Sequence, residues 1–123
     1  MRALIVDDSR FARNFLRAML EKKGIVCADA PDGRSALDLL HTSDPFDFAL
    51  VDWNMPVMNG LELLRRMRAE GFAELKVMMV TTEAENEFIV NALEAGADEY
   101  LMKPFNDEAL SEKLVLIGLA EEV

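Results

Sequence analysis

The stretch Ala3-Leu4-Ile5-Val6-Asp7-Asp8 is a short run of apolar residues that stops at two adjacent carboxylates. Such a run is typical of a strand that is buried on both faces of a parallel sheet. The pattern returns three times along the chain. The later runs and the polar residues that end them are 48–51 with Asp52, 77–80 with Thr81, and 100–102 with Lys103.

Helix-like segments separate the strand-like runs. Ser9 can cap a helix that ends near Gly24, and the apolar positions of this helix recur at four-residue spacing. These apolar positions are Phe11, Ala12, Phe15, Leu16, Met19 and Leu20. The other predicted helices lie around 36–40 and over 60–71, 83–95 and 106–121, and the predicted strands are 2–6, 25–30, 46–51, 75–80 and 98–102.

Strands that alternate regularly with helices predict an α/β fold. The expected architecture is a doubly wound (βα)5 domain, with a five-stranded parallel sheet, right-handed crossovers and helices on both faces. A chain of 123 residues, of which 51% are hydrophobic, can bury one core without metals or disulfides. We therefore expect one domain that spans residues 1–123.

Composition excludes several classes of function. No apolar stretch approaches the ~18 residues that a membrane span needs, and the first residues do not resemble a signal peptide. The single cysteine, Cys27, cannot form an internal disulfide, which fits a reducing cytoplasm. A net charge of −10 argues against binding to nucleic acid and favours protein partners with basic patches.

The polar residues at the strand ends form the candidate site. Because the carboxyl ends of parallel strands share one edge of a sheet, we expect Asp7, Asp8, Asp52, Thr81 and Lys103 to meet in one crevice. Three carboxylates and one ammonium leave a charge that one Mg²⁺ ion would balance with its preferred oxygen ligands. A carboxylate can also attack phosphorus, and Asp52, on the predicted central strand, is the best candidate nucleophile.

Five motifs in this order resemble the receiver domains of two-component response regulators. The motifs are Val6-Asp7-Asp8-Ser9, Asp52-Trp53-Asn54-Met55-Pro56, Asn59-Gly60-Leu61-Glu62-Leu63-Leu64, Val80-Thr81 and Lys103-Pro104-Phe105. The resemblance covers essentially the whole chain and is strongest to single-domain chemotaxis regulators, which share the sequence motif Asp-Trp-Asn-Met-Pro. It implies a flavodoxin-like strand order of 2-1-3-4-5, as the general description of this fold class also has it.

The resemblance also implies a separate role for each acidic residue. Asp52 would be the phosphoacceptor. Asp8, Asp52 and the backbone carbonyl of Asn54 would hold Mg²⁺, with Asp7 acting through a water molecule.

Further roles follow from the same resemblance. Thr81 and Lys103 would bind the phosphoryl oxygens, and Tyr100 would move with Thr81 as a switch. Asn54 and Glu83 would set the rate of dephosphorylation. We also predict a cis peptide bond before Pro104, because the lysine must point back over the crevice while the chain turns.

The expected partners are a histidine kinase and a protein effector such as a flagellar motor switch. The effector would bind the face formed by the fourth helix, the fifth strand and the fifth helix, and we expect a monomer. One alternative is the detached receiver domain of a regulator outside chemotaxis. The other is a phosphohydrolase with an aspartyl nucleophile, which Asn54 disfavours because an amide cannot serve as the general acid expected there. We therefore expect no enzyme activity beyond the chain's own phosphorylation and dephosphorylation.

Overall fold

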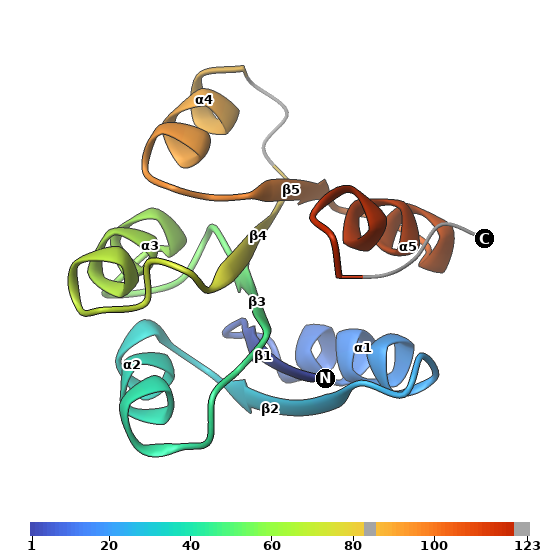
Figure 1. The fold of residues 1–123 in the computed structure, drawn as a ribbon. Coiled ribbons are helices and arrows are strands. Elements are labelled where there is room, and N and C mark those ends of the chain that lie inside the picture. Colours follow the sequence, from blue (N-terminus) through green and yellow to red (C-terminus); the bar gives the residue numbers. More distant parts are fainter. Residues whose placement is uncertain (83–85, 120–123) are drawn as a thin grey trace.

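The computed structural model describes residues 1–82 and 86–119, which form a parallel sheet flanked by helices (Figure 1). The sheet has five strands in the order β2-β1-β3-β4-β5, which confirms the predicted fold class and strand order. All neighbouring strands pair in parallel. The strands are β1 (Arg2–Val6), β2 (Val26–Ala30), β3 (Phe48–Asp52), β4 (Lys76–Thr81) and β5 (Glu99–Met102).

The helices cover both faces of the sheet. Figure 1 shows α1 and α5 on one face and α2, α3 and α4 on the other. The helices are α1 (Arg10–Glu21), α2 (Gly33–Thr42), α3 (Gly60–Ala69), α4 (Asn86–Glu94) and α5 (Asp107–Leu116). Within the two described ranges, no helix is long and apolar enough to cross a membrane.

Two apolar layers follow from the alternation of side chains along each strand. Along β1, Ala3 and Ile5 pack with residues of α1 and α5, whereas Leu4 and Val6 pack with residues of α2 and α3. All residues of β3 are buried. The inner strands therefore need apolar side chains on both faces, which explains their continuous apolar runs.

Polar side chains begin the helices where the sequence places them. Ser9 accepts a hydrogen bond from the backbone N–H of Ala12, and Asn59 forms a capping box with Glu62 at the start of α3. These caps set where the chain leaves the carboxyl edge of the sheet. They therefore also fix the position of the loops that surround the candidate site.

The last helix is shorter than the sequence pattern predicts. The predicted helix 106–121 is wrong at its end, because α5 stops at Leu116. Gly118 has a φ of 79°, in the left-handed region that glycine adopts easily and that ends a helix. The predicted start of the fourth helix at Glu83 lies outside the described residues.

Candidate functional site

The first part of the site is the turn that follows β1. The Asp7 side chain is 2% exposed, and its Oδ1 accepts a hydrogen bond of 2.9 Å from the backbone N–H of Ser9. The Asp7 N–H donates to the carbonyl oxygen of Ala30, at 3.2 Å, which extends the pairing of β1 with β2. Asp8, one residue further, is exposed. The backbone thus turns at the end of the strand, and both acidic side chains reach the same edge.

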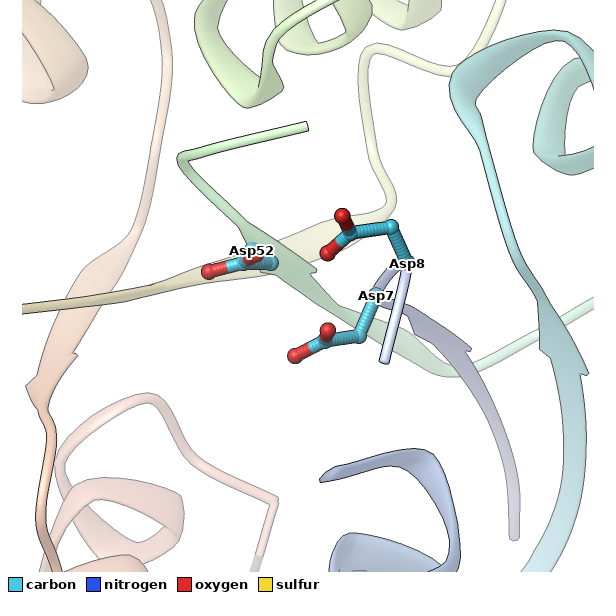
Figure 2. Close-up of side chains that lie close together, drawn as sticks. All are labelled: Asp7, Asp8 and Asp52. Atoms are coloured by element: carbon cyan, nitrogen blue, oxygen red, sulfur yellow. The ribbon is translucent and has the colours of Figure 1, made fainter. Parts of the chain in front are cut away.

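The second part is Asp52, the last residue of β3, which is 6% exposed. One carboxylate oxygen from each of Asp7, Asp8 and Asp52 lies within 4.8 Å of the other two. Figure 2 shows the three carboxylates together at the ends of β1 and β3. Hard oxygen ligands in such a group suit a small divalent cation.

Lys103 provides the only ammonium that contacts these carboxylates within the described ranges. Its Nζ lies 3.1 Å from Asp7 Oδ2 and 3.3 Å from Asp52 Oδ1, so it bridges the two buried acids. Burial lowers the pKa of Lys103, but the hydrogen bond to Asp7 and the charge of Asp52 outweigh this effect and raise the pKa. The peptide bond between Lys103 and Pro104 is cis, as predicted.

Charge is not balanced in this group. Three carboxylates against one ammonium leave a net charge of −2 when all are ionised. Burial, followed by the negative charge of Asp7, raises the pKa of Asp52 from 3.8 to about 6, although Lys103 acts in the opposite direction. The ionised form of Asp52 is thus destabilised in the protein alone, and a bound cation would relieve it.

Of the remaining predicted site residues, the structure describes Thr81, Asn54 and Tyr100. Thr81 is buried at the end of β4, and its backbone carbonyl accepts a hydrogen bond of 2.8 Å from the N–H of Lys103. Asn54 is exposed in the loop that follows β3.

Tyr100 is half-buried on β5 and lines the same small cavity as Thr81. Lys113 Nζ lies over the Tyr100 ring, 4.3 Å from the ring centre. Glu83 lies outside the described residues, so the prediction for its role stays a prediction.

Gly60 is a residue of the site that the sequence interpretation missed. A Cβ atom at Gly60 would lie 2.4 Å from the backbone oxygen of Asp52, so only glycine lets α3 start this close to β3. The Gly60 N–H also donates to the carbonyl of Trp53, at 2.9 Å. The Asn-Gly pair in the sequence indicates a cap or turn, but it does not reveal this contact.

Val57, in the loop between Asp52 and α3, has an unusual backbone conformation. Its φ is 69°, in the left-handed region that β-branched residues rarely adopt, and its side chain is fully exposed. Local strain of this kind collects near functional sites. No feature of the sequence predicts it, because valine normally indicates extended backbone.

Comparisons with known proteins agree with this geometry. Residues 3–115 match the response regulator receiver domain family. The chain is 44% identical to the chemotaxis protein CheY of Pseudomonas aeruginosa over 116 residues, which are 93% of each chain. It is 43% identical to CheY-3 of Vibrio cholerae serotype O1, over 93% of this chain and 88% of that protein.

A solved structure gives the same result for the fold. The chemotaxis protein CheY4 of Vibrio cholerae superimposes with a TM-score of 0.89 at 34% identity, over 94% of this chain and 97% of that one. The sequence match and the structural match both span nearly the full receiver fold. This chain belongs to the response regulator receiver domain family.

Proposed function

We propose that this chain, over residues 1–123, is a phosphorelay response regulator that takes a phosphoryl group on Asp52 from a histidine kinase. The observation that carries the proposal is the excess negative charge of the two buried carboxylates, Asp7 and Asp52, and the exposed Asp8, which Lys103 only partly neutralises within the described residues. A group of charges that only stabilises the fold is expected to balance its charge. A site that receives a cation and a phosphoryl group needs this excess of negative charge.

Mg²⁺ is the cation that this donor set suits best. Asp8, Asp52 and the backbone carbonyl of Asn54 would hold it, with Asp7 acting through a water molecule. When bound, the ion neutralises charge on the transferring oxygens. The pKa of Asp52, about 6 in the protein alone, leaves the carboxylate mostly ionised at neutral pH and therefore able to act as a nucleophile.

The chain's own residues perform the transfer. A carboxylate oxygen of Asp52 attacks the phosphorus of a phosphohistidine, so a P–O bond forms while the P–N bond breaks and its electron pair returns to the imidazole nitrogen. Lys103 then donates from Nζ to a phosphoryl oxygen in exchange for part of its contact with the carboxylates. Thr81 donates from its hydroxyl to another phosphoryl oxygen.

The signal would pass from Thr81 to the face formed by α4, β5 and α5. Each charge-assisted hydrogen bond to the phosphoryl group contributes ~1.5–3 kcal/mol. Two such bonds approach the ~5.5 kcal/mol that moves an equilibrium from 1:99 to 99:1. Tyr100 supports this route, because it shares a cavity with Thr81 and contacts Lys113 of α5.

The relatives named as chemotaxis proteins support a motility pathway for the effector. We propose that the chain works as a cytoplasmic monomer and that the effector binds the α4-β5-α5 face. Asn54 and Glu83 would control hydrolysis of the aspartyl phosphate by water. The exposed position of Asn54 beside the phosphoacceptor supports its part in this step.

Intact-mass spectrometry after incubation with acetyl phosphate and MgCl₂ tests the phosphoacceptor. The wild-type chain is expected to gain one phosphoryl group, and Asp52→Asn is expected to gain none. Asp32→Asn is the matched control, because Asp32 lies at the same edge of the sheet and asparagine preserves its helix cap. An adduct of equal yield on Asp52→Asn would contradict the assignment.

A further inference from the structure

We propose that the ion pair between Arg13 and Asp29 positions the Asp7–Asp8 turn for binding of the cation. Arg13 lies on α1 and Asp29 on β2, and neither belongs to the acidic group itself. The inference rests on the proposed metal site and assigns to it two positioning residues.

The contacts of Arg13 link three segments of the chain. Its Nη1 donates to the backbone oxygen of Asp7 at 2.7 Å, and its Nε donates to Asp29 Oδ2 at 3.1 Å. The Arg13 side chain is 14% exposed. A guanidinium is planar, so two hydrogen bonds from different nitrogens fix its orientation. Arg13 therefore holds the Asp7 carbonyl at a set position relative to β2.

This carbonyl matters because it belongs to the peptide that joins Asp7 to Asp8. A peptide unit is planar, so fixing its oxygen also fixes the direction in which the chain continues to the Cα of Asp8. Within the described residues, the Asp8 carboxylate accepts no hydrogen bond and forms no ion pair. Its direction therefore depends on its backbone, unlike that of Asp7, which Ser9 and Lys103 also hold.

Asp29 makes this arrangement compatible with cation binding. A lone arginine close to the acidic group would cancel part of the negative charge that attracts a cation. Asp29 neutralises Arg13 locally, so the arginine orients the turn while the excess charge of the acidic group is kept. Arg17 also contacts Asp29, with its Nη2 3.2 Å from Oδ1, but it bonds to the carbonyl of Cys27 and not to the turn.

Titration with MgCl₂, followed by the fluorescence of Trp53, tests this role. Trp53 is the only tryptophan, is buried and adjoins Asp52. We expect Arg13→Gln to raise the dissociation constant for Mg²⁺ by ~10-fold, as is usual when a residue that orients a metal ligand is lost. Arg13→Lys is expected to lie between Arg13→Gln and the wild type, because one ammonium cannot reproduce the planar fork.

Arg17→Gln is the matched control. It removes a neighbouring arginine of α1 that also contacts Asp29, and we expect it to leave the dissociation constant within about twofold of the wild type. Thermal unfolding of each variant separates a general loss of stability from the specific loss of Mg²⁺ affinity. Asp29→Asn, which keeps the shape of the side chain, is expected to weaken Mg²⁺ binding several-fold and carries the test if Arg13→Gln does not fold.

The results distinguish this inference from the function on which it rests. An unchanged dissociation constant in Arg13→Gln or Asp29→Asn, or an equal increase in Arg17→Gln, overturns the positioning role and leaves the metal site intact. A wild-type chain whose fluorescence and calorimetric heat show no response to MgCl₂ overturns the metal site, and the positioning role with it.

Discussion

The two edges of the sheet carry charge clusters that are built in opposite ways. At the carboxyl edge, the three carboxylates of Asp7, Asp8 and Asp52 lie near the ammonium of Lys103. At the amino edge, the guanidinium of Arg68 donates to the carbonyls of Phe72, Leu75 and Gly96 and to Asp98 Oδ2. Asp98 Oδ2 in turn accepts from the N–H of Val77 at 2.8 Å.

Under the proposed function, the difference is that between a structural cluster and a cluster that binds a ligand. The Arg68 cluster satisfies its polar groups with protein partners, and its carboxylate, Asp98, pairs with both Arg68 and Lys76, so the cluster ties α3 to the starts of β4 and β5. The acidic cluster keeps more negative charge than its protein partners neutralise. We expect this excess charge to lower the free energy of unfolding, and a cation bound at the carboxyl edge to raise it again.

Removal of Arg68 is expected to have the largest effect. Arg68→Met leaves Asp98 and several carbonyls without their donor, and we expect a loss of about 4 kcal/mol in the free energy of unfolding. Urea denaturation measures this loss. Under conditions in which the variant stays folded, its affinity for Mg²⁺ should equal that of the wild type. A variant that is as stable as the wild type would remove the contrast between the two edges.

Asp52→Asn is expected to act in the opposite direction. Without Mg²⁺ at pH 7.5, removing this buried charge should stabilise the chain by about 2 kcal/mol, since each pKa unit is worth ~1.4 kcal/mol and Lys103 loses part of its contact. Asp52→Asn and the wild type are compared by urea denaturation in EDTA.

The pH dependence of this difference has a definite sign. The pKa of Asp52 is about 6 in the folded chain against the ordinary 3.8, so the folded state binds the proton more tightly. The wild type should therefore lose stability as the pH rises from about 4 through 6, relative to Asp52→Asn. The gap between the two proteins should be small at pH 4 and widest above pH 7. A gap that narrows as the pH rises would contradict the cause assigned to the shift.

Val57→Gly tests whether the carboxyl edge also stores backbone strain. Glycine adopts a positive φ without penalty, so we expect this variant to be about 1 kcal/mol more stable than the wild type. Val26 is the control, because it is an exposed valine in the regular strand β2. Val26→Gly should destabilise the chain. If both variants lose stability in thermal unfolding, Val57 is not strained in solution.

The sequence predicts the carboxyl edge better than the amino edge. Asp52 and Thr81 end a strand, Asp7 and Lys103 directly follow one, and parallel topology alone brings strand ends together. Arg68 donates to the carbonyl of Gly96, 28 residues later in the sequence. This contact depends on the orientation of α3 against the sheet, which no local sequence pattern encodes. The link between Arg13 and the Asp7 carbonyl depends in the same way on how α1 lies over β1 and β2.

Hydrophobic periodicity along a helix also does not predict how far each apolar side chain is buried. The apolar stripe of α1 includes Leu16 and Leu20, which are buried, but also Phe11 and Phe15, which are 79% and 44% exposed. The stripe is wider than the surface of the sheet that α1 can cover. Both the end of α5 and the loop at Val57 contain a residue with a positive φ angle. A glycine in the sequence, such as Gly118, indicates that a positive φ is possible, whereas a valine, such as Val57, does not.

The excess charge at the carboxyl edge is the proposed cation site, and Mg²⁺-dependent thermal unfolding at constant ionic strength tests this proposal most directly. We expect the unfolding temperature of the wild type to rise with MgCl₂ and to level off as the site fills. Asp52→Asn should lose most of this rise, and Arg68→Met should keep it from a lower starting temperature. An equal rise in the wild type and Asp52→Asn would contradict the account.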